Sequence, residues 1–286
     1  MNNKNLDKLI TEALAIEAED AKEAGAIGYM ARALTQATLP HSKQDGNEFT
    51  RQNGLFTLSL MAPAKVGLPY GSIPRLLIAW VTTEAVRTKD PYLELGPSLS
   101  GFMAELGLQP TGGRWGSITR LRDQTNRLFK SFISCSYTTD QTDNIKNILL
   151  VDEAKLWWSP KAPDQNTLWR SHVLLNKAFF DEVTRNPVPV DMRALKALKR
   201  SPMALDIYCW LTYRLSYLKK PTPIPWAALQ MQFGAGYPMT PQGQRDFKKK
   251  FLQQLKAVLT IYPLANVEPQ DEALLLLPSH THIRKN

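Results

Sequence analysis

Residues 114 to 130 combine five basic side chains with a single acid, Asp123. The basic residues are Arg114, Arg120, Arg122, Arg127 and Lys130. Arginine can donate two hydrogen bonds to the edge of guanine, and serine, arginine and lysine can all bind phosphate. These residue types therefore predict contact with DNA. Considered alone, the charged side of such a helix would as readily be an ordinary solvent-exposed face.

Three predicted elements would position these side chains. A short amphipathic helix at 98–108 is followed by a turn at 109–116 that is rich in glycine and begins with proline. The next helix, 117–131, has its apolar residues on one stripe and most of its basic residues on the other side. A helix, a turn and a basic helix place side chains in a DNA major groove, and a strand at 132–137 would extend this motif to a winged helix.

Positions along the basic helix predict different roles. The residues nearest its start, Arg114, Ser117 and Arg120, are best placed for base edges, with Arg122 at the border of the outer face. Arg127 and Lys130 lie further along and are expected to hold the DNA backbone. Trp115 has two interpretations: its ring covers the top of the core, or it stacks at the DNA surface. Strands at 132–137 and 148–151 would form the wing.

The second half of the chain repeats this pattern at an offset of about 125 to 130 residues. Residues 201–211 echo 72–81, and residues 225–234 echo the helix at 98–107. A second basic amphipathic helix, 243–259, follows. Its inward residues are Phe247, Phe251, Leu255 and Val258, and its outward residues are Arg245, Lys248, Lys249, Lys250 and Lys256. Arg245, Lys248 and Lys249 occupy the early positions that correspond to the DNA-contacting ones of the first helix, and Lys256 is expected to contact phosphate. Strands at 260–262 and 273–277 would form a second wing, whose acidic turn (Glu268, Asp271, Glu272) is expected to point away from DNA.

Bulk properties agree with a polyanionic partner. The chain has 286 residues, a net charge of +9 and a pI of about 9.5. Residues 1 to 40 carry a balance of −2, which leaves +11 for the remainder. No run of apolar residues approaches the roughly 18 that a bilayer span requires. Cys135 and Cys209 lie in separate apolar segments, which predicts reduced, buried thiols in a bacterial cytoplasm.

These patterns predict an α+β fold that is predominantly helical, with two tandem winged-helix domains related by internal duplication. Residues 1–47 would form an acidic helical arm, with a helix at 5–37, and a linker. Residues 48–165 would form the first winged-helix domain, ending in a connector at 155–165, and residues 166–286 the second. A strand at 56–61 and a buried helix from Ser72 to about residue 87 would complete the first domain.

Enzymatic chemistry has little support in the sequence. The glycine-rich stretch 112–117 lacks the lysine of a phosphate-binding loop and follows a helix instead of a strand. The four histidines and two cysteines have no familiar metal-site spacing, so no metal or cofactor is expected. One catalytic alternative stays open: a DNA-nicking enzyme in which His280 and His282 bind a metal and Tyr262 is the nucleophile.

Three segments carry a family resemblance. Residues 66–88 (VGLPYGSIPRLLIAWVTTEAVRT), 111–124 (TGGRWGSITRLRDQ) and 201–208 (SPMALDIY) closely resemble plasmid-encoded RepA-type replication initiators. The likeness extends from about Phe49 to about Val267. It implies a protein that binds repeated sites in a plasmid origin, helps melt adjacent A·T-rich DNA and brings the host initiator and helicase to it. Related initiators also dimerise to repress their own genes.

Within the matched motif, the resemblance implies DNA contact by Arg114, Arg120 and Arg122. The leading hypothesis is therefore a non-enzymatic, origin-binding initiator that acts on double-stranded DNA, with no membrane partner and a possible homodimer. The alternatives are a winged-helix transcriptional repressor, which could regulate its own gene, and the nicking enzyme. Direct repeats beside the gene would favour the initiator, whereas a repressor needs only an operator.

Overall fold

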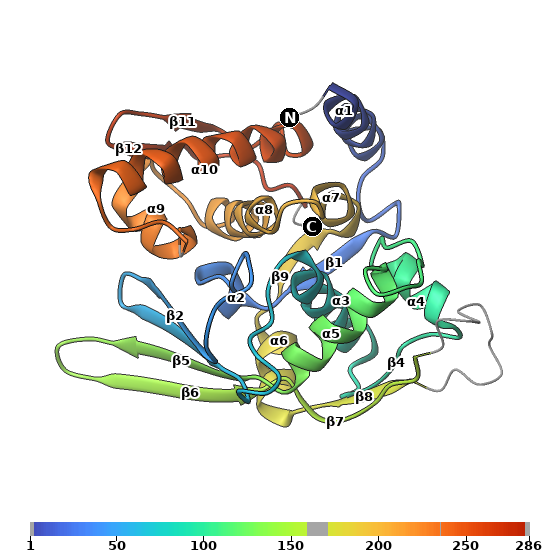
Figure 1. Cartoon of the computed structure of the whole chain (residues 1–286). Helices are drawn as coiled ribbons and strands as arrows, with labels where there is room; N and C mark the ends of the chain where they lie inside the picture. The colour runs from blue at the N-terminus through green and yellow to red at the C-terminus, as the bar shows by residue number, and fades with distance from the viewer. Residues whose placement is uncertain (1–2, 159–170, 235, 284–286) are drawn as a thin grey trace.

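The computed structural model describes residues 3–158, 171–234 and 236–283, and it has a mixed α/β fold (Figure 1). The elements of the N-terminal half are α1 (Asn3–Ala18), β1 (Ile27–Met30), α2 (Arg32–Gln36), β2 (Glu48–Asn53), β3 (Phe56–Met61), α3 (Ser72–Thr88), β4 (Tyr92–Glu94), α4 (Leu99–Glu105), α5 (Ser117–Phe129), β5 (Phe132–Thr138) and β6 (Asp143–Leu149). Those that follow are β7 (Val151–Lys155), β8 (His172–Leu175), α6 (Lys177–Arg185), β9 (Val188–Asp191), α7 (Met192–Leu198), α8 (Pro202–Leu215), β10 (Thr222–Pro225), α9 (Trp226–Phe233), α10 (Pro241–Ile261), β11 (Val267–Pro269) and β12 (Ala273–Leu276).

One order of elements occurs twice. The first unit consists of α3, β4, α4, α5, β7 and β8, and the second of α8, β10, α9, α10, β11 and β12. In each unit three strands form an antiparallel sheet with the last strand in the middle, β4-β8-β7 and β10-β12-β11. In Figure 1 the second unit forms the upper part of the molecule and the first unit the lower part.

The central helix of each unit is apolar on nearly all sides. Residues 76–81 of α3 and 203–212 of α8 are all buried, as expected for helices surrounded by other elements. The predicted helices at 72–87, 201–211, 225–234 and 243–259 are thus present with shifted ends. Gly71 is the N-cap of α3, and Ser72 is the first residue of the helix.

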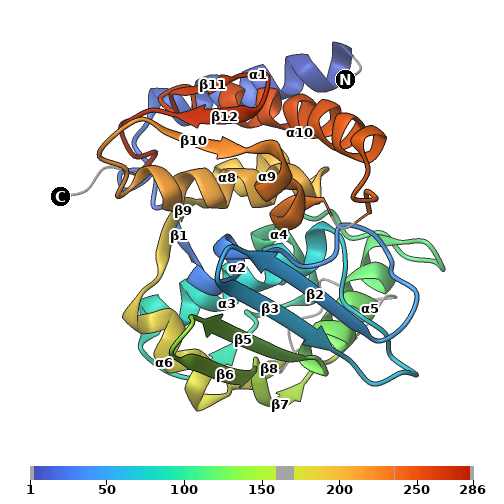
Figure 2. The same cartoon turned by 90° about the vertical axis from the view of Figure 1, so that its left-hand side faces the viewer.

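The predicted first wing is misplaced. The strands expected there, 132–137 and 148–151, correspond to β5 and to parts of β6 and β7. β5 and β6 join β2 and β3 in a four-stranded antiparallel sheet that faces the viewer in Figure 2. The wing position after α5 is taken by β7 and β8. From residue 159 onward, the predicted connector at 155–165 lies outside the described residues.

Of the two strands predicted for the second wing, one is present at the expected residues and the other is not. Helix α10 continues to Ile261, so the strand expected at 260–262 is wrong, and β11 starts later, at Val267. The strand expected at 273–277 is present as β12. Phe247, Phe251 and Val258 are fully buried along α10, and the apolar stripe continues to Ile261, which is 1% exposed, so the helix extends beyond the predicted end.

The N-terminal arm is not a single helix. Helix α1 ends at Ala18, and β1 and α2 occupy the rest of the predicted helix at 5–37. At Gly28 in β1, an added Cβ would lie 2.3 Å from the Met192 sulfur, so a side chain there would prevent this close packing. β1 pairs with β9, which ties the arm to the segment before α7 instead of leaving it separate.

The predicted boundary after residue 165 separates strands that the structure pairs. β8 lies beyond that boundary, yet it pairs with β4 and β7 of the first unit. Among the described residues, no helix combines the length and apolarity that a membrane span needs.

Candidate nucleic-acid interface

Helix α5 buries one stripe and exposes the opposite one. Ile118, Leu121 and Leu128 are 2% exposed or less, and Thr125 is buried between them, as the sequence predicts. The amide of Gln124 is also buried and accepts a hydrogen bond from the backbone N–H of Tyr70. The exposed residues of the helix and its C-terminal end are Thr119, Arg120, Arg122, Asp123, Asn126 and Lys130. With 3.6 residues per turn, Asp123, Lys130 and Thr119 face most directly away from the core, and Asn126 lies beside them.

The turn before α5 is held by the Ser117 hydroxyl. This oxygen donates to the Gln109 carbonyl at 2.5 Å and accepts from the backbone N–H and hydroxyl of Thr111. Ser117 is only 6% exposed, so the structure contradicts its expected place at the DNA-facing surface. Gly116 completes the turn, because an added Cβ would lie 2.2 Å from the Thr111 carbonyl oxygen.

At the tip of this turn lie an arginine and a tryptophan. The Trp115 side chain is 80% exposed, so the interpretation that it covers the core is wrong. The Arg114 guanidinium is also exposed and lies over the indole, 5.1 Å from the ring centroid.

The remaining basic side chains of this region divide into free and engaged groups. Arg120, Arg122 and Lys130 are exposed, and their side chains make no hydrogen bond or ion pair within the described ranges. Arg127 is engaged instead. Its Nε donates to Asp123 at 2.8 Å, its Nη1 donates to the Leu68 carbonyl, and the guanidinium lies over the Tyr70 ring. Arg127 thus fixes the segment before α3, contrary to its expected availability for phosphate.

A groove runs between α5 and strand β7. It has a volume of about 850 Å³ and is lined on the helix side by Thr119, Arg122, Asn126 and Lys130. Asp152 and Ala154 of β7 lie on the opposite side. The exposed face of α5 is therefore bordered by Arg122 toward β7 and by Arg120 on the side of Arg127 and residue 68.

Helix α10 presents a different outer surface. Arg245, Lys249 and Lys256 are exposed and share one side of the helix. Lys248 lies on another side. Its ammonium donates to the carbonyls of Gln270 and Asp271 and lies over the Trp226 ring.

Lys248 thus ties the β11–β12 turn to α10, and it is not free for the DNA contact expected of it. The acidic turn that was expected to point away lies beside the helix on this side. Glu268, Asp271 and Glu272 are exposed there.

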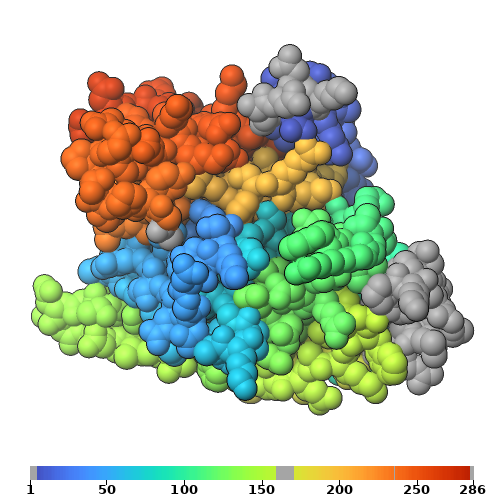
Figure 3. Space-filling view, viewed as in Figure 1, coloured from blue at the N-terminus to red at the C-terminus, as the bar shows by residue number. Residues whose placement is uncertain are grey.

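Both basic helices lie on one face of the molecule. α5 and α10 lie toward the viewer in Figure 1 and on the right-hand side in Figure 2, whereas α6 lies on the opposite side. In the space-filling view, the segments around α10 (orange) and around α4 and α5 (green) both reach the surface, with the blue segment before β2 between them (Figure 3).

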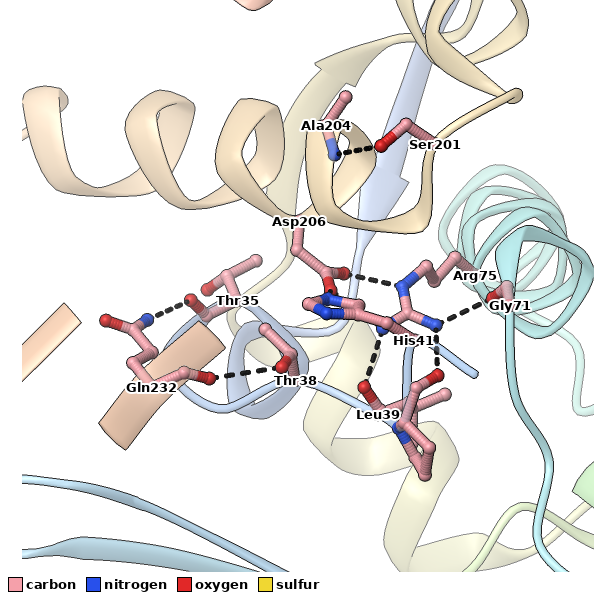
Figure 4. Close-up of polar contacts among 11 residues, drawn as sticks. Thr35, Thr38, Leu39, His41, Gly71, Arg75, Ser201, Ala204, Asp206 and Gln232 are labelled. Atoms are coloured by element: carbon pink, nitrogen blue, oxygen red, sulfur yellow. Dashed lines mark hydrogen bonds and ion pairs between the residues drawn. The ribbon is translucent and has the colours of Figure 1, made fainter. Parts of the chain in front are cut away.

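A buried ionic cluster fixes the two units relative to each other (Figure 4). Arg75 of α3 donates from Nε and Nη2 to the two carboxylate oxygens of Asp206 in α8, both at 2.7 Å. The same guanidinium donates to the carbonyls of Leu39, Pro40 and Gly71. His41 Nε2 lies 2.7 Å from Asp206 Oδ2.

Protonation in this cluster follows from burial and charge. Burial alone would raise the pKa of Asp206, but Arg75 and His41 outweigh it and the pKa is lowered. Burial lowers the pKa of His41 despite the neighbouring carboxylate. Because an ionised carboxylate only accepts hydrogen bonds, the neutral His41 ring must carry its proton on Nε2.

Comparison with known proteins identifies the family. A family model described as "Plasmid encoded RepA protein" matches residues 68–224, more than half of the chain. The chain belongs to this family. The match confirms the resemblance to RepA-type replication initiators that the motifs indicated.

Solved structures support the fold of this RepA-family chain. A crystal structure of RctB domains 2-3 (RctB-155-483) is 11% identical, with a TM-score of 0.52 over 85% of this chain and 94% of that one. A selenomethionine derivative of RctB domains 2 and 3 is also 11% identical, with a TM-score of 0.54 over 86% and 96%. At this identity the likeness concerns the fold alone. A search of curated proteins found no match.

The residues of the nicking alternative are engaged within the RepA-family fold. The Tyr262 hydroxyl is buried and donates to the His280 carbonyl at 2.7 Å, and burial raises its pKa. His282 Nδ1 lies 2.7 Å from the Tyr208 hydroxyl. No group of three His, Cys, Asp or Glu side chains is arranged to hold a metal within the described ranges. These contacts place the Tyr262 side chain in the core.

Sequence reasoning missed the ionic cluster and the exposed Asn126 of α5. A lone arginine in the apolar run 73–81 and a lone aspartate in the apolar run 203–211 were the available signal for the cluster. Two isolated opposite charges in apolar helices need each other as partners, since an unpaired buried charge is costly. Asn126 carried no such signal, because uncharged polar residues are common on exposed helix faces.

Proposed function

We propose that this RepA-family chain is a plasmid replication initiator that binds repeated sites in the origin as a sequence-specific, double-stranded-DNA-binding protein. In this proposal it promotes local melting, recruits the host initiator and helicase, and acts in the bacterial cytoplasm. The observation that carries the proposal is the presentation of two basic helices, α5 and α10, on one face at the same position in two units of equal element order.

We regard the two units as winged helices related by duplication, each with a recognition helix. The order helix, strand, helix, helix, strand, strand and the common strand arrangement of both sheets support this interpretation. In a winged helix the third helix enters the major groove, so α5 and α10 would occupy neighbouring grooves of one duplex. Two linked readers bind more tightly and cover a longer footprint than either alone.

The two helices would divide the work. α5 surrounds uncharged polar residues, Thr119 and Asn126, with the free arginines Arg120 and Arg122, a set suited to base edges. α10 presents the cations Arg245, Lys249 and Lys256 in one stripe, a set suited to phosphates. Melting would draw on the binding energy used to deform the duplex, since deformation differs in cost between sequences.

The direct test is a footprint on the plasmid that encodes the chain. We expect protection of direct repeats, each spanning about two helical turns of roughly 10 base pairs. Arg120→Ala should abolish the protection of these repeats when the protein concentration is limiting. Arg185→Ala is the matched control, because this arginine is exposed at the end of α6 on the opposite side of the molecule.

Other outcomes separate the alternatives. Protection confined to one inverted repeat at the promoter would identify a dimeric repressor instead of an initiator. Relaxation of supercoiled origin plasmid in the presence of magnesium or manganese would identify a nicking enzyme. Absence of any protected region at low salt would reject DNA binding altogether.

A further inference from the structure

The turn between α4 and α5 presents a large aromatic ring to solvent. Trp115 is 80% exposed, more than any other large hydrophobic side chain of the described residues. The backbone beneath it is firmly held. Thr119 Oγ1 donates to the Gly113 carbonyl, the Gly116 N–H donates to the same carbonyl, and the Ile118 N–H donates to the Thr111 carbonyl. The indole is thus displayed by a hydrogen-bonded turn.

Such a ring is pre-organised for a partner. A tryptophan buries a large apolar area at little conformational cost, and little is spent on ordering when the turn is already formed. Trp115 does not line the groove beside β7. Trp115 immediately precedes Gly116, the N-cap residue of α5. This position places the ring where that helix would meet a duplex.

Charge around the ring favours a polyanion as the partner. The Arg114 guanidinium lies 5.1 Å from the indole centroid, and Arg120 lies in the first turn of α5. Residues 109–117 contain no acid. An aromatic ring flanked by arginine is the combination that stacks on nucleic-acid bases while holding the adjacent phosphate.

An intact duplex leaves no gap for an indole between its stacked base pairs, so stacking requires a base that has left the stack. We propose that Trp115 stacks on a base displaced from the duplex at one end of the α5 site, so that recognition by α5 and local strand separation occur together. The inference rests on the proposed function. It adds a residue and a contact through which binding opens the DNA.

The test uses the full chain and a duplex that the wild-type protein selects from a random-sequence pool. Single thymines are replaced by 5-iodouracil, and irradiation should crosslink one of them to Trp115, as peptide mass spectrometry would reveal. Permanganate should oxidise a thymine near that position, because only unstacked thymines react. Trp115→Ala should remove both signals and weaken binding roughly 5- to 150-fold, the range of one base–aromatic stack. Trp115→Phe should restore part of each.

Tyr217→Ala is the matched control. Tyr217 is 47% exposed and has the Arg214 guanidinium 5.1 Å from its ring centroid, but it follows α8 instead of preceding α5. We expect this variant to keep the affinity, the crosslink and the permanganate signal. Urea unfolding of Trp115→Ala should match the wild type, because the side chain makes no core contact.

Three results would overturn the inference. A crosslink to Trp115 without a permanganate-reactive thymine would show contact with an intact duplex. Unchanged binding by Trp115→Ala would remove the ring from the interface. Loss of a host-protein contact by Trp115→Ala, with DNA binding and the permanganate signal intact, would assign the ring to a protein partner. If the wild-type chain selects no duplex, the proposed function fails instead.

Discussion

Helices α5 and α10 occupy the same position in the two units but differ in what holds their basic residues. In α5, Arg120 and Arg122 are free, and Arg127 is bound within the protein. In α10, Lys249 and Lys256 are exposed and free, and Arg245 donates to the Gln242 side chain of the same helix. Lys248 is bound to the β11–β12 turn. Each helix therefore uses one basic residue to hold its neighbouring segment and leaves the rest outward.

The difference teaches that basic residues in one helix are not equivalent. A guanidinium flanked by threonine and asparagine can distinguish bases, whereas a stripe of cations responds to phosphate alone. The comparison predicts that variants of Arg120 and Arg122 in α5 change sequence preference and that variants of α10 do not. It also requires that the two units keep a fixed relation, which the Arg75–Asp206 pair supplies.

The largest effect is expected at that junction. Asp206→Ala leaves the buried Arg75 guanidinium without its carboxylate, so the free energy of unfolding should fall by about 3 to 5 kcal/mol. Urea unfolding followed by circular dichroism measures this. Asp181→Ala is a control from an exposed pair with Lys177, and it should cost about 1 kcal/mol or less. A loss this small at Asp206 would mean that the pair does not fix the units.

The next effect concerns sequence reading. Arg120→Ala should weaken binding to the selected duplex by about 1 to 3 kcal/mol and relax preference at one base position. Affinity measurements on single-base variants of the duplex would show this directly. Equal losses on every sequence, including unrelated DNA, would assign Arg120 to the backbone and erase the contrast with α10.

Acidification should loosen the junction through His41. Its folded-state pKa lies below the ordinary value of 6.5, so the unfolded chain takes up the proton first as pH falls. Stability is therefore full above about pH 6.5 and declines below it, by at most about 1.4 kcal/mol per pH unit for one group. The pKa of Asp206 is lowered from its ordinary value of 3.8, so the stability that this carboxylate contributes is lost only below about pH 3.8.

His41→Gln keeps a donor to Asp206 and removes the titration. Urea unfolding at pH 7.5 and 5.5 should show a smaller difference for this variant than for the wild type. An identical difference would place the pH response elsewhere, with His282 as the next group to examine because burial also lowers its pKa.

Phosphate contact by α10 predicts a uniform, salt-dependent loss. Lys249→Ala should weaken binding to all duplexes up to roughly tenfold near 0.1 M salt and reduce the salt slope by about 1. Lys130→Ala, at the end of α5, should behave in the same way. A change in base preference for Lys249→Ala would give α10 a reading role that the comparison denies it.

Local patterns predicted α3, α4, α5, α8, α9 and α10, which bury clear apolar faces, but they merged α1, β1 and α2 into one helix and did not predict α6 and α7. Leu121 and Leu128 in α5, and Phe247 and Phe251 in α10, were identifiable from spacing alone. The prediction of the first wing was wrong because two strand pairs, β5–β6 and β7–β8, follow α5 in the sequence. β5 and β6 follow α5 directly, yet β5 pairs with β3, which is distant in sequence, and β6 pairs with β5.

The candidate site likewise contains features that helical spacing predicts and features that it does not. Exposure of Arg120 and Arg122 followed from the helical period. The internal roles of Ser117, Arg127 and Lys248 did not, because each depends on a carbonyl from another segment: Gln109, Leu68 and Gln270. Helical spacing gives the side of a residue, but it does not reveal which neighbouring backbone will reach that side.

The smallest effect on DNA binding is expected at Lys248, and it tests the internal role directly. Lys248→Met keeps an apolar stem over Trp226 and removes the ammonium that donates to Gln270 and Asp271. The free energy of unfolding should fall by about 1 kcal/mol for the lost hydrogen bonds. Duplex affinity and salt slope should stay close to the wild type, in contrast to the neighbouring Lys249→Ala. A salt slope lowered by as much as in Lys249→Ala would show that Lys248 leaves the turn to bind phosphate, and the two helices would then differ less than their contacts indicate.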